Sequence, residues 1–565
     1  MAAERSSRWR YGLVGAIFVA GAAALGARAY FLQVVDVDFL RKQGEGRYLA
    51  ALPTVARRGV ITDRNGEPLA VSTAVQSVGL IPGEFEPTPE NFERLARVIG
   101  AKPKALGRRF AANRNSNIVL VARRVTPEIA DRVTALELEG VRLERDYRRF
   151  YPSGEASAHV IGFTDVDDVG QEGLELALES RLAATPGLRR VMRDRTGRLV
   201  DEVGLIEAAH DGVDVALALD HRLQYIAYRE LKAAVQSAGA RGGSLVLLDP
   251  ATGEILAMAN QPSFNPNSAD KGELRARRNA AVADVIEPGS TLKPFTIAAA
   301  LEAHALTPGS IIETSPGWMR VGKYTVRDHR DYGAIPVADV IRHSSNVGAG
   351  KIALAQPRER LAHLYDMLGF GRPTQSAFPG EGAGQLAPPG EWSDAQHATL
   401  GYGYGIGVTT LQLAQAYAVI ANDGVFTPVT FELRDGPVEQ TRVLDAQTAR
   451  QLRAMLETVV RDGTGRAAAV PRYRVGGKTG TVHKVSRDGY SEDRYRALFA
   501  GMAPITTPEL VLVVVIDEPA AGEYFGGQVA APVFSAVMAQ ALRLRSIAPE
   551  LERPATRLAS SVGAP

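Results

Sequence analysis

The stretch VIEPGSTLKPF, residues 285–295, is the part of the sequence from which the fold and the chemistry are predicted. A turn at Pro288-Gly289 followed by a helical pattern places Ser290 at the start of a helix, with Lys293 on the same helical face. A serine hydroxyl is a poor nucleophile unless a neighbouring base takes its proton, and a lysine can be that base when burial lowers its pKa. Ser-x-x-Lys alone also fits a helix cap beside a solvated lysine, so this motif predicts catalysis only in combination with others.

Two further motifs lie later in the chain. Ser344-Ser345-Asn346 begins 54 positions after Ser290, and Lys478-Thr479-Gly480-Thr481 begins 134 positions after Ser344. Glycine in such a strand lets a ligand approach the backbone closely. The ordered set S-x-x-K, S-x-N and K-T-G is that of penicillin-binding proteins and serine β-lactamases, and the sequence strongly resembles that superfamily.

The resemblance covers about Arg57 to Arg545, nearly the whole folded chain. Within the superfamily, the sequence resembles class B penicillin-binding proteins of the division-specific (FtsI, penicillin-binding protein 3-like) type. The stretches that carry it, besides 285–295, are RRGVITDRNGEPLA (57–70), YPSGEASAHVIGFTDVDDVGQEGLE (151–175), HSSNVGAGKIAL (343–354), GYGYGIGVTTLQLAQAYAVIANDG (401–424) and YFGGQVAAPVF (524–534).

The fold implied by this resemblance has three parts. They are a single N-terminal transmembrane helix, an α+β pedestal domain, and an α/β transpeptidase domain of the penicillin-binding and serine β-lactamase type, in which helices flank an antiparallel sheet. The expected boundaries are a cytoplasmic tail at 1–10, an anchor at 11–35, a non-catalytic, dimerisation-like pedestal at 36–225, a transpeptidase domain at 240–546 and a disordered tail at 547–565.

Local patterns agree with this division. Asn65-Gly66 predicts a tight turn between two short strands. SLVLLDPATGEILAMAN (244–260) predicts a hairpin, and HRLQYIAYRELKAAVQS (221–237) has the apolar spacing of an amphipathic helix. Strands are predicted at 117–124, 140–150, 214–220, 497–503 and 510–517, and helices at 126–136, with Thr126 as N-cap, and at 531–545.

The N-terminus predicts a membrane anchor. Three arginines in the first ten residues precede the uncharged stretch 11–27, and Arg28 is followed by another uncharged run to residue 35. A helix over 11–35 spans the roughly 30 Å hydrocarbon core, and its basic flank stays in the cytoplasm. The alternative is a cleaved signal peptide, because Ala27-Arg28-Ala29 fits a small-x-small cleavage pattern. We expect an uncleaved anchor, since the uncharged segment is longer than a usual signal core.

The resemblance implies acyl transfer in two steps. Ser290 attacks the carbonyl between the two terminal D-alanines of a stem peptide, with Lys293 as general base. Ser344 and Lys478 relay the proton to the leaving nitrogen, and Asn346 orients Lys293 and binds the substrate amide. An amine of a neighbouring stem peptide then attacks the acyl-enzyme, whereas a penicillin would acylate Ser290 without easy release.

Substrate binding is implied at the third motif. Backbone N–H groups of Ser290 and Thr481 form the oxyanion hole, and such donors contribute roughly 2.7–4 kcal/mol each. The hydroxyls of Thr479 and Thr481, with the Lys478 charge, bind the terminal carboxylate, and Gly480 completes the substrate-binding strand.

Composition limits the partners and cofactors. The 565 residues include 65 Lys plus Arg and 63 Asp plus Glu, so the net charge of +2 gives no reason to expect nucleic acid. No cysteine is present, which excludes disulfides, thiolate metal sites and a cysteine nucleophile. The histidines, among them His159, His329, His343 and His483, lack metal-ligand spacing, so they are interpreted as packing or surface residues and no metal or cofactor is expected.

The expected partners are those that the resemblance implies. They are peptidoglycan stem peptides and their lipid-linked precursor, β-lactam antibiotics, the membrane, an FtsW-type glycosyltransferase and other divisome proteins. The expected location is the cytoplasmic (inner) membrane, single-pass, with the N-terminus cytoplasmic and the catalytic domain periplasmic.

Four other functions compete with this interpretation. A class A β-lactamase needs a deacylating glutamate after S-x-N, and Glu359, Glu381 and Glu391 lack the E-x-x-L-N context. The pedestal argues against a carboxypeptidase. An elongation-specific class B transpeptidase stays open, because only resemblance separates it from the division type. A division scaffold with little catalysis also stays open, although all three motifs are intact.

Overall fold

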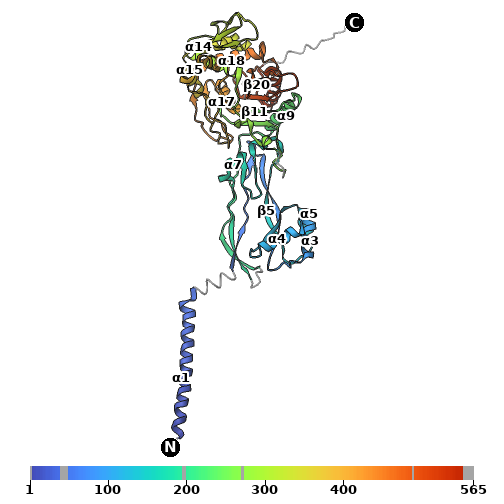
Figure 1. Ribbon diagram of the computed structural model, residues 1–565, viewed down its shortest axis with the longest axis vertical. Coiled ribbons are helices and arrows are strands. Elements are labelled where there is room, and N and C mark those ends of the chain that lie inside the picture. Colours follow the sequence, from blue (N-terminus) through green and yellow to red (C-terminus); the bar gives the residue numbers. More distant parts are fainter. Residues whose placement is uncertain (1–2, 39–48, 194–198, 269–272, 487–488, 551–565) are drawn as a thin grey trace, which may run out of the picture. The chain divides into compact units, whose positions relative to one another are not determined.

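The N-terminal segment forms one long helix. The computed structural model describes residues 3–38, 49–193, 199–268, 273–486 and 489–550. Helix α1 (Ala3–Tyr30) continues through a π-helical turn, η1 (Phe31–Val35), as Figure 1 shows. Within it the 27 residues Trp9–Val35 are long and apolar enough to cross a membrane. This confirms the long apolar helix predicted at 11–35.

The chain divides into two compact units whose segments alternate along the sequence. The first contains Met1–Arg58, Ser72–Arg148 and Ala184–Gly212, and the second contains Gly59–Val71, Arg149–Ala183 and Val213–Pro565. The second unit therefore takes in two segments that precede residue 213 in the chain.

The first unit contains a three-stranded sheet. Its strands are β1 (Leu49–Thr54), β8 (Gly187–Arg193) and β9 (Leu199–Glu207), with β8 in the centre and both neighbours antiparallel to it.

An α/β part completes the first unit. Strand β4 (Val119–Val125) pairs with the end of β3 (Pro68–Leu80), and β5 (Val141–Phe150) pairs with β3 as well. Helices α3 (Pro89–Ile99), α4 (Pro103–Ala112) and α5 (Pro127–Thr134) accompany these strands. The strands predicted at 117–124 and 140–150 and the helix predicted at 126–136 are confirmed.

Capping differs between two helices of this unit. Thr88 caps α3 by accepting a hydrogen bond from the Asn91 N–H at 3.2 Å. Thr126 occupies the N-cap of α5 as predicted, but its side chain makes no capping hydrogen bond. The sequence pattern thus predicted where α5 begins, but not that the Thr126 side chain would leave the usual capping hydrogen bond unformed.

A five-stranded antiparallel sheet forms the centre of the second unit. Its order is β12-β11-β21-β20-β19, which places β19 at one edge. The strands are β11 (Gly242–Leu248), β12 (Ile255–Gln261), β19 (Gly476–Ser486), β20 (Gly489–Ala503) and β21 (Leu510–Asp517). The predicted hairpin over 244–260 is confirmed as β11–β12, and the two late strands as parts of β20 and β21.

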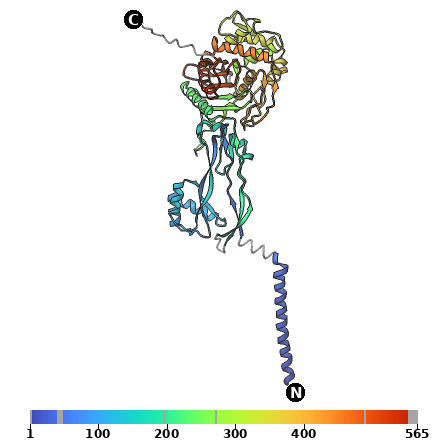
Figure 2. The ribbon, with the colours of Figure 1, turned by 180° about the vertical axis from the view of Figure 1, so that it is seen from behind.

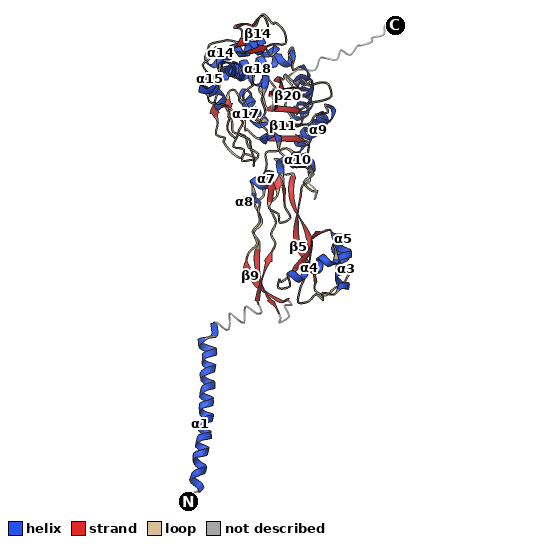
Figure 3. Cartoon of the chain, viewed as in Figure 1, coloured by secondary structure: helices blue, strands red, loops and turns tan. Residues whose placement is uncertain are grey.

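Helices cover both faces of this sheet (Figures 2 and 3). Alternate strand residues, such as Leu245 and Phe499, pack with α9 (His221–Ser237) and α20 (Ala531–Leu544). Residues of opposite phase, such as Val246 and Leu498, pack with helices that include α12 (Lys293–Glu302) and α17 (Thr410–Ala421). A strand exposes successive side chains to opposite faces, so one sheet separates two cores. This is the helix-flanked antiparallel sheet predicted for the transpeptidase domain.

The remaining elements complete the described part of the chain. They are β2 (Ile61–Thr62), α6 (Ala158–Ile161), β6 (Phe163–Thr164), β7 (Gly170–Glu172), α7 (Gly173–Ala177), α8 (Glu179–Leu182), β10 (Val215–Ala216), α10 (Leu274–Arg277), α11 (Ala280–Ala283), β13 (Ile311–Glu313), β14 (Trp318–Val321), β15 (Tyr324–Arg327), β16 (Ala334–Pro336), α13 (Val337–His343), α14 (Asn346–Leu354), α15 (Arg358–Met367), α16 (Asp394–Leu400), β17 (Val425–Phe426), β18 (Thr441–Arg442), α18 (Ala446–Arg461), α19 (Gly526–Val529) and the 3-10 turns η2 (Gly154–Ala156), η3 (Gly289–Leu292), η4 (Pro389–Glu391) and η5 (Arg466–Ala468).

Strand β10 is shorter than predicted. The sequence predicts a strand over 214–220, but only Val215–Ala216 pairs regularly, in parallel with β2. The next residues divide their pairing: the Leu217 N–H still donates to the Thr62 carbonyl of β2, but Leu217 also bridges to Glu432, and the Ala218 N–H donates to the Phe431 carbonyl. Apolar alternation alone does not distinguish such divided pairing from a regular strand.

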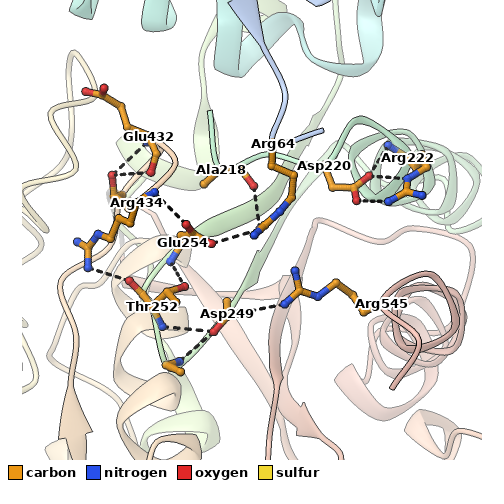
Figure 4. A network of polar contacts seen from close by, with 12 residues as sticks. Arg64, Ala218, Asp220, Arg222, Asp249, Thr252, Glu254, Glu432, Arg434 and Arg545 are labelled. Atoms are coloured by element: carbon orange, nitrogen blue, oxygen red, sulfur yellow. Dashed lines mark hydrogen bonds and ion pairs between the residues drawn. The ribbon is translucent and has the colours of Figure 1, made fainter. Parts of the chain in front are cut away.

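A polar network ties the segment 59–71 to the sheet of the second unit (Figure 4). The Arg64 guanidinium lies 3.2 Å from the buried Glu254 carboxylate, which also accepts a hydrogen bond from the Arg434 N–H at 3.1 Å. Nearby, Arg545 lies 3.1 Å from Asp249. These contacts join residues from four distant parts of the sequence.

A second, fully buried ion pair lies within the other early segment, 149–183. The Arg149 and Glu175 side chains are 2% and 0% exposed, and their charged atoms lie 2.6 Å apart. Arg149 also donates to the Gly59 carbonyl at 2.8 Å. The pair therefore holds three separate stretches of the chain together.

The chain stays packed on this unit beyond α20. Ile547 is buried, and its carbonyl accepts a hydrogen bond from the Tyr473 hydroxyl at 2.7 Å. The Glu550 carboxylate accepts from the Arg474 N–H at 2.9 Å. The part of the predicted disordered tail from residue 551 on lies outside the described residues.

Candidate active site

Ser290 lies on a 3-10 turn, η3, directly before helix α12, which begins at Lys293. The turn depends on glycine, because Gly289 has φ +53° and a Cβ there would lie 2.4 Å from a Val482 methyl group of β19. Its N–H donates to the Gly403 carbonyl at 3.0 Å. The turn is thus held between the edge strand and the glycine-rich stretch 401–407, and the Ser290 side chain is half-buried.

Lys293 is fully buried beside the second motif. Its ammonium group donates to the Ser344 carbonyl at 2.5 Å, to the Ser344 hydroxyl at 3.1 Å and to the Asn346 side-chain oxygen at 2.9 Å. The structure therefore brings together Lys293, Ser344 and Asn346, as the sequence predicted. Among the described residues the hydrogen bonds of the Lys293 ammonium group go to these two residues and not to Ser290.

The second motif lies between two helices. Ser344 caps the end of α13 in the left-handed region, with φ +61°, a conformation that costs a non-glycine residue about 1–3 kcal/mol. Ser345 caps the start of α14, where its hydroxyl accepts from the Gly348 N–H at 2.8 Å. The short connection between the helices turns both Ser344 and Asn346 toward Lys293.

The third motif lies on the edge strand β19. Lys478 is fully buried, and its ammonium group donates to the Thr479 carbonyl at 3.0 Å and to the Thr479 hydroxyl at 3.2 Å. A Cβ on Gly480 would lie 3.1 Å from the Pro288 carbonyl oxygen, so the strand passes close to the turn that carries Ser290. The Thr481 hydroxyl accepts from the Gly526 N–H at 3.0 Å.

The two buried lysines have lowered pKa values. Burial lowers the pKa of Lys478 to about 7. The pKa of Lys293 is lowered well below its usual value, by burial first and by the positive charge of Lys478 second, while the negative charge of Asp328 partly raises it. A lysine with a lowered pKa can exist as a neutral amine near neutral pH and so accept a proton.

Two acidic residues at the site were not predicted from the sequence. Glu287 accepts hydrogen bonds from the Gly405 N–H at 2.8 Å and from the Tyr490 hydroxyl at 2.9 Å, and burial raises its pKa. Asp328 accepts from the Ser345 hydroxyl and the Asn346 N–H, each at 2.5 Å. Glu287 could have been found from its place in the stretch 285–295, whereas Asp328 has no local signal.

Aromatic rings line the end of the edge strand. Tyr495 stacks on Tyr524 with ring centroids 4.2 Å apart, and Tyr524 stacks on Phe525 at 4.4 Å. His483 lies 4.6 Å from Tyr495 and His329 lies 6.3 Å from Phe525. Phe525 directly precedes the Gly526 that donates to Thr481, so this row of rings borders the third motif.

The described residues contain one group with potential metal ligands, Asp63, Asp220 and His221, whose ligand atoms lie within 4.8 Å of one another. Burial alone would raise the pKa of Asp63, but hydrogen bonds from His221, Asn65 and Glu67 bring it down to about 2. These bonds hold the turn between β2 and β3, so the group has a structural explanation.

Comparison with known families agrees with this geometry. The model for the penicillin binding protein transpeptidase domain matches residues 243–539, and that for the penicillin-binding protein dimerisation domain matches residues 53–217. The chain belongs to the penicillin-binding protein transpeptidase family. The family match covers all three motifs and most of the five-stranded sheet.

Similar proteins support the same family over nearly the full length. The chain is 42% identical over 552 residues to the probable peptidoglycan D,D-transpeptidase PbpC of Pseudomonas aeruginosa, covering 97% of both chains. It is 40% identical over 551 residues to the peptidoglycan D,D-transpeptidase FtsI of Escherichia coli K12, covering 96% of this chain and 93% of that one.

A solved structure gives the same result for the fold. Penicillin binding protein 3 of Mycobacterium tuberculosis, complexed with aztreonam, matches with a TM-score of 0.69 and 29% identity, covering 89% of this chain and 99% of that one. The predicted fold is therefore confirmed: an N-terminal apolar helix, a dimerisation (pedestal) domain and a transpeptidase domain.

Proposed function

We propose that this chain is a peptidoglycan D,D-transpeptidase in which Ser290 carries the acyl group. The observation that supports this assignment best is Lys293, a fully buried lysine with a lowered pKa that lies three residues from Ser290 and is held by Ser344 and Asn346. Family membership and relatives named peptidoglycan D,D-transpeptidase agree with a serine-type acyltransferase.

In the first step neutral Lys293 takes the proton of the Ser290 hydroxyl, and the oxygen attacks the carbonyl between the two terminal D-alanines. Lys293 turns from its present hydrogen bonds toward Ser290 for this transfer, and Ser344 and Asn346 keep it within reach. When the C–N bond breaks, a proton passes through Ser344 and Lys478 to the leaving nitrogen. D-Alanine leaves, and an ester joins the donor peptide to Ser290.

The edge strand β19 binds the donor. Backbone N–H groups of Ser290 and Thr481 stabilise the oxyanion. The Thr479 and Thr481 hydroxyls and the Lys478 charge bind the terminal carboxylate, and Gly480 lets the strand pass close to the turn that carries Ser290. In the second step an amine of a neighbouring stem peptide attacks the ester and loses a proton to Lys293. The ester C–O bond breaks, Lys293 returns the proton to the Ser290 oxygen, and a peptide cross-link and a free Ser290 hydroxyl result. A β-lactam acylates the same serine.

The setting of the reaction is inferred from the anchor and the relatives. The helix Trp9–Val35 spans the cytoplasmic membrane once in this proposal, with the N-terminus in the cytoplasm and the chain after the helix in the periplasm; the length and apolar composition of the helix and the arginines before it support this. The substrate is lipid-linked precursor polymerised by an FtsW-type glycosyltransferase. Relatives named FtsI favour the septum over elongation.

The assignment is tested by labelling membranes with a fluorescent penicillin. Wild type should form a stable covalent adduct and Ser290→Ala should form none, while Ser237→Ala, an exposed serine on α9, should label normally. Thermal melting checks that all three proteins are folded. Folded wild type that stays unlabelled, or Ser290→Ala that labels, would contradict the assignment, and depletion in cells then separates a septal from an elongation phenotype.

A further inference from the structure

Asp328 lies in the loop after strand β15, outside all three sequence motifs, and contacts the second motif directly. Its carboxylate accepts hydrogen bonds from the Ser345 hydroxyl at 2.5 Å, the Asn346 N–H at 2.5 Å and the Val347 N–H at 3.1 Å. The chain thus brings a residue 18 positions before Asn346 onto the start of α14.

Asp328 is a second capping group at the start of α14, supplied by a segment outside the helix. The N-cap residue itself, Ser345, already caps the helix with its hydroxyl. A carboxylate that accepts N–H groups in the first turn is stabilised by the helix dipole, and charge-assisted hydrogen bonds of this kind are shorter and stronger than neutral ones. The start of α14 is therefore fixed more firmly than the helix alone requires.

Asn346 transmits this fixation to Lys293. Its N–H is bound by Asp328, its side-chain N–H₂ donates to the Arg327 carbonyl at 3.1 Å, and its side-chain oxygen accepts from Lys293 at 2.9 Å. The backbone N–H and the side-chain amide N–H of Asn346 are thus both bound by consecutive residues, Asp328 and Arg327. The side-chain oxygen of Asn346 accepts from Lys293.

The charge of Asp328 also reaches Lys293. The charged groups that act on Lys293 are Lys478 on β19, which lowers its pKa, and Asp328, which raises it, while burial is the largest lowering influence. The direct partners of the Lys293 ammonium, Ser344 and Asn346, are neutral.

We propose that Asp328 is a positioning residue for acylation, which fixes Asn346 and thereby holds Lys293 for proton transfer from Ser290. This inference rests on the proposed function, because it assigns a role in that reaction. Asp328 does not touch the reacting atoms. It acts through Asn346 and through its charge.

Asp328→Asn tests the proposal in the full-length protein in detergent. An asparagine oxygen can still accept from the Asn346 N–H, and the Ser345 hydroxyl can turn to accept from the new amide, so shape is kept and charge is removed. The matched control is Asp331→Asn, three residues along the same loop, where the exposed carboxylate accepts from the Ser315 hydroxyl and the Gly333 N–H, both at 2.9 Å. The readout is the second-order rate of acylation by a fluorescent penicillin between pH 5.5 and 9, normalised to the folded fraction.

Asp328→Asn should acylate about tenfold more slowly than wild type, since the hydrogen bonds that hold Asn346 lose the charge that makes them roughly twice as strong as neutral ones. Its rate–pH profile should change as well. The base must be neutral, so the rate rises as pH passes through the Lys293 pKa. Removing Asp328 lowers that pKa further, and the acid limb should move to lower pH. Asp331→Asn should match wild type in both rate and profile.

Asp328→Glu covers the case in which Asp328→Asn does not fold. It keeps the charge and displaces it by one methylene, so the acid limb should stay at the wild-type pH while the rate falls. A folded Asp328→Asn with the wild-type rate and profile overturns the inference, as does a folded Asp328→Glu with the wild-type rate. Wild type that is not acylated at all would instead overturn the proposed function, so the two failures are distinguishable.

Discussion

Two places in the second unit bury positive charge, and they do so in opposite ways. Arg149 lies 2.6 Å from the Glu175 carboxylate, with both side chains almost fully buried. Lys293 and Lys478 are also fully buried, but the hydrogen bonds described for them go to neutral oxygen atoms of Ser344, Asn346 and Thr479. The first site pairs its charges, whereas the second brings two like charges into one buried region.

The difference teaches what each site is built for. A paired buried charge keeps its ionisation, and breaking it leaves an uncompensated charge. An unpaired buried lysine shifts its pKa instead, and at Lys478 burial lowers the pKa to about 7. Perturbed pKa values of this kind cluster where proton transfer occurs. We infer that the first pair serves stability and the two lysines serve chemistry.

Lys293→Met should have the largest effect. It removes the proposed general base, and loss of such a group lowers rates by about 10²–10⁴-fold. The rate of acylation by a fluorescent penicillin measures it, with thermal melting as the check on folding. A folded Lys293→Met that acylates at the wild-type rate would show that another group takes the Ser290 proton.

Glu175→Gln should have the next largest effect, and on a different property. It removes the carboxylate charge that lies 2.6 Å from the buried Arg149 guanidinium, and breaking such a buried pair lowers the free energy of unfolding by about 3–5 kcal/mol. Denaturant unfolding of the full-length protein measures the loss. Acylation per folded molecule should stay at the wild-type rate, so a specific loss of acylation would place this pair in the catalytic machinery rather than in the scaffold.

Much of this site could be predicted from the sequence, because the three motifs consist of short local patterns on regular elements. The order of Ser290, Ser344 and Lys478 in the chain predicted the family, and the structure brings Lys293 to Ser344 and Asn346. The hairpin β11–β12 and helix α9 were predicted from apolar periodicity, which reports burial of one face.

The missed features depend on contacts between distant segments. Asp328 reaches α14 through a loop, and no local pattern marks a loop aspartate as a helix cap for another segment. Arg149 and Glu175 pair across 26 positions, and neither resembles a buried residue in its own strand or helix. Regular pairing of β10 ends after Ala216, because the next two residues also pair with the distant residues Phe431 and Glu432.

Lys478→Met should raise stability, the opposite of Glu175→Gln. The Lys478 pKa is about 7 in the folded protein and lies near 10.4 in an unfolded chain. As pH falls, Lys478 therefore becomes protonated in the unfolded state before it does so in the folded state. The loss of folding stability that this causes begins near pH 10.4, grows down to about pH 7 and is complete below pH 7. An apolar replacement should raise the free energy of unfolding at neutral pH by about 1–4 kcal/mol, with a smaller gain near pH 10.

Lys478→Met should also change the pH dependence of acylation, because Lys478 acts on the Lys293 pKa. The Lys478 charge lowers the Lys293 pKa, so its removal should raise that pKa and move the acid limb of residual acylation to higher pH. That shift is opposite to the one expected for Asp328→Asn. Denaturant unfolding across pH 7–10 and the rate–pH profile measure the two effects, and a destabilised Lys478→Met would mean that its hydrogen bonds to Thr479 outweigh the cost of burial.

Glu432→Gln should have the smallest effect, although it removes an ion pair of the same length. Arg181 and Glu432 also lie 2.6 Å apart, but their side chains are 44% and 43% exposed. Water solvates both charges in the folded and unfolded states, so the pair contributes about 0–1 kcal/mol. The difference between variant and wild type should vanish at about 1 M salt, where the screening length is about 3 Å. Since Glu175→Gln makes the same chemical change at the same distance, equal losses for the two variants would show that burial does not decide what an ion pair contributes in this protein.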